Sequence, residues 1–220
     1  MINLFYIWGV KIAKIDLKKE YKELYSPKKD KISFIEVPKF KYLSIEGKGN
    51  PNTSIDYQNS INALMPVSFK TKFLMKKEYS SDYVVMPLEG LWWADNIEDF
   101  RSNNKDVWKW KSMIMQPDFV EKEHINQAID EVLSKKDISP DIISSIEKIK
   151  FEDFKEGLSA QILHVGSYSD EKSTINKLHE NILDNGYEFN GLHHEIYLSD
   201  VRRTKPEKLR TIIRQPIIKN

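Results

Sequence analysis

The chain has 220 residues, of which 40% are hydrophobic and 11% are aromatic, so it can bury a substantial core and is not expected to be disordered. Lys and Arg number 34 against 33 Asp and Glu, and this balance gives no overall attraction to nucleic acid or anionic lipid. The absence of cysteine excludes disulfides, thiolate nucleophiles and cysteine-ligated metals, and it fits a cytoplasmic location.

The N-terminal segment is predicted to lie outside the main domain. Residues 1–10 are apolar, but they are too few to cross a bilayer and lack the basic region and cleavage site of a signal peptide. Residues 16–31 are mostly charged and predict a short helix that ends at Ser26 and Pro27. We therefore expect residues 1–31 to form a leader and a short helix, with no membrane-crossing segment.

The first half of the main domain predicts strands around one helix. The helix is expected over residues 50–65, where Thr53 and Asp56 form a capping-box pattern ahead of apolar residues at helical spacing. Four β-like runs surround it, at residues 32–38, 40–49, 82–95 and 107–117.

Two helices are predicted between the halves. Residues 118–135 have apolar positions on one helical face, with Asp118 as the candidate N-cap. Ser139 and Pro140 then mark the start of a second, shorter helix.

The second half predicts the same kinds of element as the first. A helix is expected over residues 170–184, with acidic residues in its first turn and a stop at Asn185 and Gly186. The predicted strands of this half are residues 157–166, 192–200 and 208–216.

The order strand, helix, strand, strand therefore occurs twice. Two local echoes support a duplication: a Gln-Pro pair ends both 113–117 and 212–216, and Glu89 answers Glu195. The prediction is an α+β fold over residues 32–217, built from tandem pseudo-symmetric repeats whose antiparallel sheets form a central ligand groove. Its expected parts are repeat one at about 32–117, linker helices at 118–150 and repeat two at about 151–217.

Phosphate-binding loops and metal sites have little support. Gly47 and Gly49 precede a predicted helix, but Asn52 stands where a dinucleotide fingerprint needs its third glycine, so a turn is favoured. His193 and His194 are adjacent in a predicted strand and point to opposite faces, so they do not share a metal. We expect neither a metal nor a cofactor.

The strand at 192–200 separates two kinds of side chain by its period of two. Its even-numbered face is mostly apolar and predicts core. Its odd-numbered face places Glu195 between His193 and Tyr197. That face is either solvated surface, on which Glu195 pairs with Arg202 or Arg203, or the floor of a ligand site.

Four of the five tryptophans fall in one predicted hairpin. Alternation puts Trp93 on the face of Glu89, so we expect Trp93 to be a partly exposed wall of the site and Trp92 to be buried against a helix. Of Trp108 and Trp110, whichever faces outward is expected to contribute a second wall. Aromatic walls around one carboxylate suit flat apolar or cationic ligands.

Several stretches together resemble the GyrI-like small-molecule-binding family over about residues 32–217. They resemble in particular its stand-alone bacterial members, whose relatives include cyclopropanoid cyclopropyl hydrolases. The family pattern usually has proline where this chain has Val201. The stretches that carry the resemblance are YLSIEGKGNPN, YVVMPLEGLWWADN, MIMQPDFV, HVGSYSDE and NGYEFNGLHHEIYLSDVRRTKPEKLRTIIRQP.

The resemblance implies a groove between two halves in which a glutamate at the position of Glu195 meets cationic aromatic drugs. In the hydrolase branch, a glutamate and aromatic residues support attack of water on the cyclopropane of duocarmycin-type alkylators. The implied catalytic residues are Glu195 and Tyr197. The family pattern matches Glu89, Trp92 and Trp93, and with Trp108, Trp110 and His193 from the strand pattern these are the expected ligand-binding residues.

Two functions remain open from the sequence: a hydrolase of strained cyclopropanes, and a module that binds or sequesters drugs without catalysis. In both, the expected partner is an aromatic or cationic small molecule. No helix-turn-helix is predicted and the charge is balanced, so a nucleic-acid partner is not expected.

Overall fold

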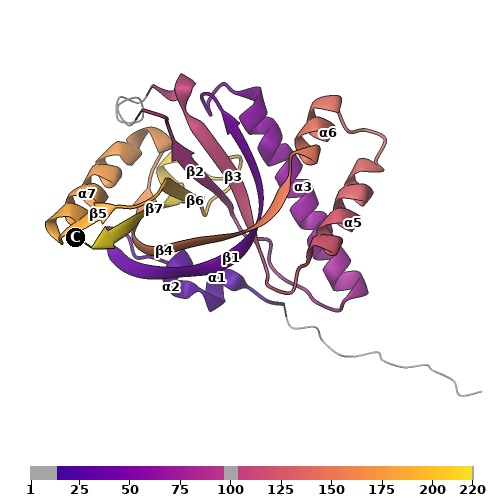
Figure 1. Ribbon diagram of the computed structural model, residues 1–220, viewed down its shortest axis with the longest axis horizontal. Helices are drawn as coiled ribbons and strands as arrows, with labels where there is room; N and C mark the ends of the chain where they lie inside the picture. The colour runs from indigo at the N-terminus through magenta and orange to yellow at the C-terminus, as the bar shows by residue number, and fades with distance from the viewer. Residues whose placement is uncertain (1–13, 97–103, 220) are drawn as a thin grey trace, which may run out of the picture.

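The computed structural model describes residues 14–96 and 104–219 (Figure 1). The expected leader at residues 1–13 lies outside the described residues. The helices are α1 (Leu17–Glu20), α2 (Lys22–Tyr25), α3 (Ile55–Glu78), α5 (Lys122–Leu133), α6 (Pro140–Glu147) and α7 (Glu171–Asp184). The strands are β1 (Ser33–Lys48), β2 (Leu88–Trp93), β3 (Lys109–Gln116), β4 (Lys150–Val165), β5 (Tyr187–Phe189), β6 (His193–Tyr197) and β7 (Arg210–Lys219).

The strands form an α+β architecture around a barrel-like sheet. Neighbouring strands follow the order β4-β1-β3-β2-β6-β7, and β4 also pairs with β7, so six antiparallel strands close into a ring. The short strand β5 adds to β7 outside this ring. One half contributes β1-β3-β2 and the other β4-β7-β6, and the halves meet where β1 pairs with β4 and β2 pairs with β6.

β1 and β4 are paired strands of 16 residues, longer than predicted. The sequence pattern divided β1 into two runs because its buried positions change phase between Val37 and Phe40. Pro38 lies at this point and cannot donate a ladder hydrogen bond. Across the ladder, Gly157 pairs with Val37 and has a φ of +79°, which glycine adopts without steric cost. Glu156, next to Gly157, contacts His194 and Arg214 inside the barrel.

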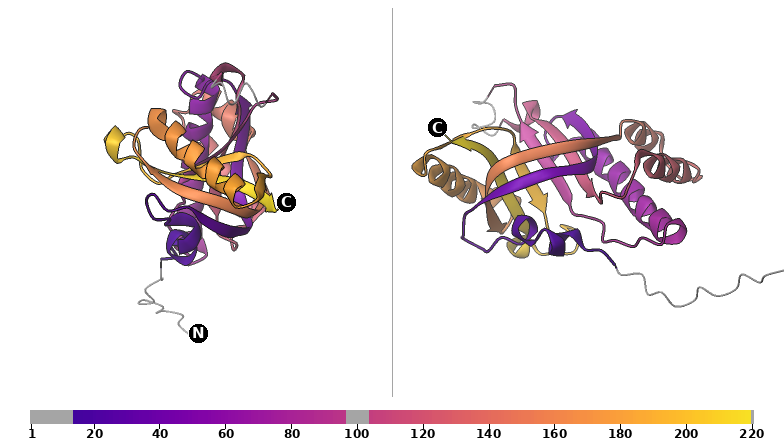
Figure 2. Two further views of the ribbon diagram at one scale, coloured as in Figure 1. Left: turned by 90° about the vertical axis from the view of Figure 1, so that its left-hand side faces the viewer. Right: turned by 60° about the horizontal axis from the view of Figure 1, so that its bottom comes forward.

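The helices lie on both faces of the sheet. α3 packs on β1 and β3 and carries α5 and α6 behind it, whereas α7 packs on β4 and β5 at the other end of the molecule (Figures 1 and 2). α2 lies against the inner face of the barrel, where Tyr25 is buried. Among the described residues, no helix is long and apolar enough to cross a lipid bilayer.

Most helix ends agree with the sequence signals, and the differences have local causes. Ser139 caps α6 with Pro140 at its first position, and α7 ends before Asn185. α3 continues well beyond the predicted end at residue 65 because the residues on both sides of Pro66 are buried, and this packing compensates for one missing hydrogen bond. The N-cap of α3 is Ser54, whereas Thr53 was predicted.

The helix α5 begins later than expected. Its N-cap is Glu121, paired in a capping box with His124, and Asp118 lies in the preceding turn. The main-chain carbonyl of Asp118 accepts a hydrogen bond from Lys41 Nζ on β1 at 2.8 Å, which holds this turn outside the helix.

A charged network fills the inside of the barrel. Glu156 accepts from Arg214 Nη1 and contacts His194 Nδ1, both at 3.0 Å, and His194 Nε2 lies 3.0 Å from Glu89. Tyr25 of α2 donates to Glu89 at 2.9 Å. These side chains are almost fully buried, and each charge in the network faces an opposite charge. Because Tyr25 belongs to α2, its bond to Glu89 connects α2 to the sheet.

The network predicts a pH-dependent stability. Burial lowers the pKa of His194, but Glu156 and Glu89 outweigh burial and raise it to about 9 from 6.5. The stabilising contribution of the protonated ring is therefore complete below about pH 6.5 and is lost as the pH rises through about 9. We expect the difference in unfolding free energy between wild type and His194→Gln, measured by urea denaturation, to be largest at pH 5–6.5 and to shrink above that range. A difference that is constant between about pH 6 and 9 would contradict a charged His194.

The strand register corrects one sequence prediction. Glu89 of β2 pairs with Ile196, and Gly90 pairs with Glu195. Directly paired residues point to the same face of a sheet. Glu89 therefore lies on the inner face with His194, whereas Glu195 lies on the opposite face, and the two glutamates do not line one groove.

Candidate functional site

The candidate site lies on the outer face of β2 and β6, between α3 and α7 (Figure 1). We call this surface the Glu195 face. Gly90 and Trp92 of β2 lie beside Glu195 and His193 of β6 in the strand register. The Glu195 side chain is only 14% exposed, so this strand carboxylate is not simple solvated surface.

Two neighbours on the same strand hold the Glu195 carboxylate. Tyr197 OH donates to Oε2 at 2.7 Å, and His193 Nε2 lies 3.2 Å from Oε1. Burial raises the pKa of Glu195, but the hydrogen bonds and charge of His193 and the bond from Tyr197 lower it below its ordinary value. Arg202, which was a possible partner of Glu195 on a solvated surface, pairs with Asp200 at 3.0 Å. Glu195 is therefore an oriented, ionised carboxylate at neutral pH.

Aromatic side chains surround this carboxylate on the side of α3. The ring of Tyr57, from the first turn of α3, lies 5.4 Å from Trp92 and 5.1 Å from Trp110. The rings of Trp92 and Trp108 lie 5.9 Å apart. These separations are typical of edge and tilted aromatic contacts, so the tryptophans and Tyr57 form one continuous apolar wall.

A second wall comes from the segment before α7. Tyr168 is 41% exposed, and its ring makes an edge contact with Tyr197 at 5.7 Å. Lys105 Nζ lies 5.3 Å from the centre of the Trp108 ring, in a cation–π contact. The exposed Tyr168 therefore gives the site access to solvent, and Lys105, next to Trp108, adds a positive charge.

A second carboxyl group lies beside Glu195. Glu171, the first residue of α7, is buried at 5% exposure. Thr211 on β7 lies close enough to act on the Glu171 carboxyl through its side chain, but no hydrogen bond of normal geometry reaches Glu171 Oε1 or the Thr211 hydroxyl among the described residues. Burial, and then the charge of Glu195, raise the pKa of Glu171 to about 9. The face therefore combines one ionised and one protonated carboxyl group at neutral pH.

Sequence reasoning missed Glu171 as a site residue. An acidic residue in the first turn of a helix has an ordinary explanation in the helix dipole, and the pattern gave no sign that this one is buried. Tyr57, Tyr168 and Thr211 were missed for a similar reason, because they reach the site from elements far apart in the chain. The available signal was the amphipathic face of 170–184, on which Glu171 precedes the buried Leu178.

The predicted tryptophan positions are partly met. Trp92 is buried against Tyr57 of α3 and Trp93 is half-buried, as alternation predicted. The register nevertheless puts Trp93 on the inner face with Glu89 and Trp92 on the Glu195 face. Trp92 therefore takes the place beside Glu195 that was expected for Trp93.

Gly90 gives a direct test of the site floor. A methyl group at this position would lie 2.8 Å from Trp92 Nε1 and 3.2 Å from Tyr197 OH. We expect Gly90→Ala to displace Trp92 and loosen the bond of Tyr197 to Glu195, with an overpacking cost of about 1–3 kcal/mol. Intrinsic tryptophan fluorescence should shift, and titration with a cationic aromatic dye should show weakened binding.

A matched control is Ser112→Ala. Ser112 pairs with Gly90 across the ladder. Its hydroxyl forms a hydrogen bond with the hydroxyl of Ser60 at 2.9 Å rather than with Tyr197. This variant should lose about 1 kcal/mol of stability and keep the affinity for the dye. Equal loss of affinity in both variants would show that general destabilisation causes the effect.

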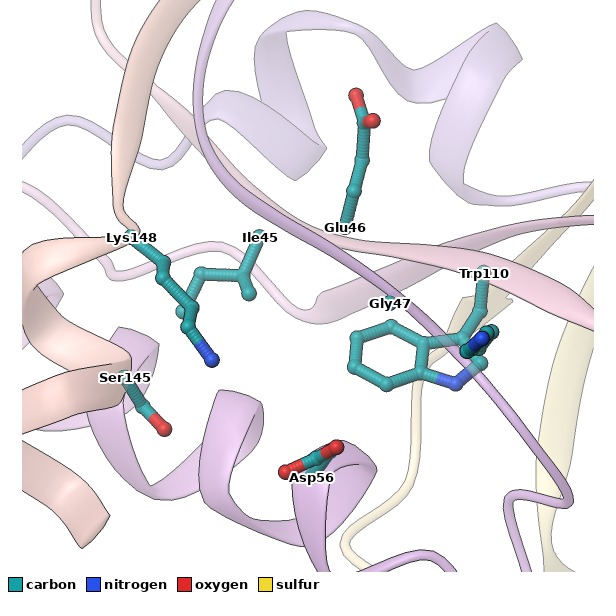
Figure 3. Close-up of a pocket in the computed structure, with 8 residues that line it drawn as sticks. Ile45, Glu46, Gly47, Asp56, Trp110, Ser145 and Lys148 are labelled. Atoms are coloured by element: carbon teal, nitrogen blue, oxygen red, sulfur yellow. The ribbon is translucent and has the colours of Figure 1, made fainter.

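A small cavity lies elsewhere, between β1, α3 and α6 (Figure 3). Trp110 and Gly47 line one side, and Asp56, Ser145 and Lys148 point into it from the helices. Its volume of about 130 Å³ is well below the 300–1,000 Å³ that is typical of pockets for organic ligands. The cavity is therefore a packing feature behind Trp110.

No metal centre was found in the part of the chain that the structure describes. Residues 14–96 and 104–219 contain no group of three His, Asp or Glu side chains that could hold a metal ion. His193 and His194 point to opposite faces, as alternation predicted.

One known family matches the chain over most of its length. A model of the GyrI-like small molecule binding domain matches residues 30–218. The chain belongs to the GyrI-like small-molecule-binding family.

Solved structures similar to this GyrI-like protein include two from Listeria innocua. An uncharacterized conserved protein is 37% identical with a TM-score of 0.83, and a hydrolase is 36% identical with a TM-score of 0.78. Each comparison covers 93% of this chain and 100% of the other. The C-terminal domain of EcmrR shares the fold at 13% identity and a TM-score of 0.54, covering 86% of this chain and 98% of that one. No protein with a curated description matches the chain.

Proposed function

We propose that this GyrI-like protein binds flat aromatic small molecules on the Glu195 face and hydrolyses those that carry a strained cyclopropane, such as duocarmycin-type alkylators. The observation that carries the proposal is the ionised Glu195 carboxylate, fixed by Tyr197 at 2.7 Å and by His193 at 3.2 Å beside an aromatic wall. The 36% identity to a Listeria hydrolase over the whole of that chain supports the enzymatic form of the proposal.

The proposed reaction needs little from the protein because the substrate is already electrophilic. The ligand packs against Trp92, Tyr57 and the neighbouring rings. Glu195 accepts a proton from a water molecule whose oxygen attacks the less substituted cyclopropane carbon. The carbon–carbon bond of the ring breaks, and its electron pair moves through the conjugated system to the carbonyl oxygen, which becomes a phenolate. The product is a ring-opened alcohol.

One buried donor is placed to help this last step. Trp92 Nε1 has no hydrogen-bond partner among the described residues, and an unsatisfied buried N–H favours a ligand that brings an acceptor. Tyr197, in contrast, already donates to Glu195. In the proposed mechanism, Tyr197 therefore orients the base, and Trp92 can stabilise charge on the ligand oxygen.

A binder without catalysis is the second candidate. The same two hydrogen bonds that orient Glu195 also lower its pKa, and a weaker base is a poorer proton acceptor. An ionised, mostly buried carboxylate beside aromatic rings suits a delocalised organic cation. Under this alternative, the protein sequesters or senses cationic drugs.

We also infer that the two halves are repeats of one unit, which places the site at their junction. The order strand, helix, strand, strand occurs in both halves when the short extra strand β5 after α7 is set aside, and each half pairs its remaining strands in the same way. The shared Gln-Pro pair of β3 and β7 supports this relation. The register does not support an equivalence between Glu89 and Glu195, because equivalent residues would point to the same face.

The experiment that tests the function compares turnover with binding. Wild-type protein is incubated with a duocarmycin-type spirocyclopropyl dienone in ¹⁸O-labelled water, and the labelled alcohol is quantified by mass spectrometry. In parallel, a cationic aromatic dye is titrated while tryptophan fluorescence is followed. Labelled product above the buffer rate supports the hydrolase. Dye binding without product supports the binder, and neither signal would overturn both.

A further inference from the structure

The Glu195 face contains several buried polar atoms that lack partners. Among the described residues, no hydrogen bond of normal geometry reaches Glu171 Oε1, Thr211 Oγ1 or Trp92 Nε1, although the Thr211 hydroxyl lies close to the Glu171 carboxyl. Thr211 and Trp92 can donate a hydrogen, and a buried donor without a partner destabilises the ligand-free protein. Their accumulation on one face indicates that a bound ligand supplies the missing partner.

We infer that the Glu171 carboxyl group carries a proton in the resting site and donates it to a carbonyl oxygen of the bound ligand. The inference rests on the proposed function for the substrate class, and it adds a second reacting group and a requirement for a conjugated carbonyl. Glu171 has suitable geometry: it is buried, belongs to the first turn of α7, and faces Thr211 and Glu195 without a hydrogen bond to Oε1.

Electrostatics explains why this carboxyl keeps its proton. Glu171 loses hydration by burial and faces the negative charge of Glu195, and both effects favour the neutral acid. The groups facing it from other elements do not reverse this preference. The Thr211 hydroxyl and then the cation at Lys105 lower the pKa of Glu171, with smaller effects than burial and Glu195. The phenols of Tyr168 and Tyr197 have pKa values raised above their usual range.

The proposed proton transfers balance. A water proton moves to Glu195 as the water oxygen bonds to the cyclopropane carbon. The ring carbon–carbon bond breaks, its electron pair reaches the carbonyl oxygen, and the proton of Glu171 moves to that oxygen to give a phenol. Glu195 is then neutral and Glu171 ionised, and proton exchange through solvent restores the resting state. The pair keeps a single negative charge throughout, so the two carboxylates never repel one another.

Rate–pH profiles test this assignment. Wild-type turnover should fall as the pH rises through about 9, because Glu171 then loses its proton. Glu171→Gln keeps the side-chain size but cannot transfer a proton, so the rate at pH 7 should fall about 10²–10⁴-fold and the fall near pH 9 should disappear. An alkaline fall that persists unchanged in Glu171→Gln, or an unchanged rate at pH 7, would overturn the inference.

A binding experiment keeps the test independent of turnover. The probes are a planar aromatic ketone and its deoxy analogue, which has the same rings without the carbonyl oxygen. Wild type should bind the ketone more tightly at pH 7 and lose this preference above about pH 9. Glu171→Leu should lack the preference at both pH values, and circular dichroism checks that this variant is folded. No preference in folded wild type would refute the role of Glu171, whereas a preference without turnover would refute only the hydrolase.

Discussion

Replacing Glu195 with glutamine is expected to slow cyclopropane hydrolysis about 10²–10⁴-fold, the usual contribution of a general base. Glutamine has nearly the same shape, and its side-chain oxygen can still accept the hydrogen bond from Tyr197. The affinity for a neutral cyclopropanoid should change little, because aromatic contacts with Trp92 and Tyr57 provide most of it. Labelled alcohol measured by mass spectrometry under single-turnover conditions gives the rate.

The matched control is Glu188→Gln, a substitution of the same kind on the exposed strand β5. It should leave both rate and affinity at the wild-type level. For a cationic dye, Glu195→Gln should weaken binding by about 2 kcal/mol, since it removes a desolvated charge. If the Glu195→Gln variant turned over at the wild-type rate, another group would have to accept the proton.

The pH dependence of turnover is a second test of Glu195 as the general base. The pKa of Glu195 lies below its ordinary value of 4.5, and a general base acts in its ionised form. Activity should therefore stay constant as the pH falls to about 4.5 and decline only below it. A decline centred near pH 6 would assign the base to a different residue.

Removing the carboxylate of Glu156 is expected to destabilise the fold by about 3–5 kcal/mol. Glu156→Ala leaves Arg214 and His194 as buried charges without their shared partner, since both contact Glu156 at 3.0 Å. Arg214 also donates to the carbonyl of Leu24 at 2.8 Å, so α2 should loosen as the network reorganises. Urea denaturation gives the free energy of unfolding, and hydrogen exchange at residues 22–25 reports the docking of α2.

Asp153→Asn is the control on the same strand. Asp153 pairs with Lys39 at 2.9 Å, but both side chains are more than half exposed. Breaking this surface pair should cost no more than about 1 kcal/mol. A similar small cost for Glu156→Ala would mean that water or a structural rearrangement satisfies Arg214 and His194, and the network would not fasten α2.

The sequence predicted features that depend on neighbours along one segment. The period of two in residues 192–200 separated His194, which contacts Glu89 inside the barrel, from Glu195 and Tyr197, which bond to each other on the opposite face. Local signals also located Ser139 at the start of α6 and Asn185 at the end of α7. Such features are predictable because side-chain direction and capping are set within a few residues.

The tertiary structure decided which residues share a face across strands. Alternation correctly placed Trp93 with Glu89, but only the pairing of β2 with β6 shows that this face is opposite to Glu195. A shift of one residue in that pairing would reverse the result. The pairing joins strands about one hundred residues apart, so packing of the whole barrel fixes it, and no local pattern reports it.

The second carboxyl group illustrates the same limit. The sequence pattern placed Glu171 in the first turn of a helix, and Glu195 beside Tyr197 on one face of a strand. Only the closed sheet brings α7, β6 and β7 together so that Glu171 is buried beside Glu195 and Thr211. Burial and the charge of a distant neighbour decide whether a carboxyl group carries a proton, and both are properties of the folded chain.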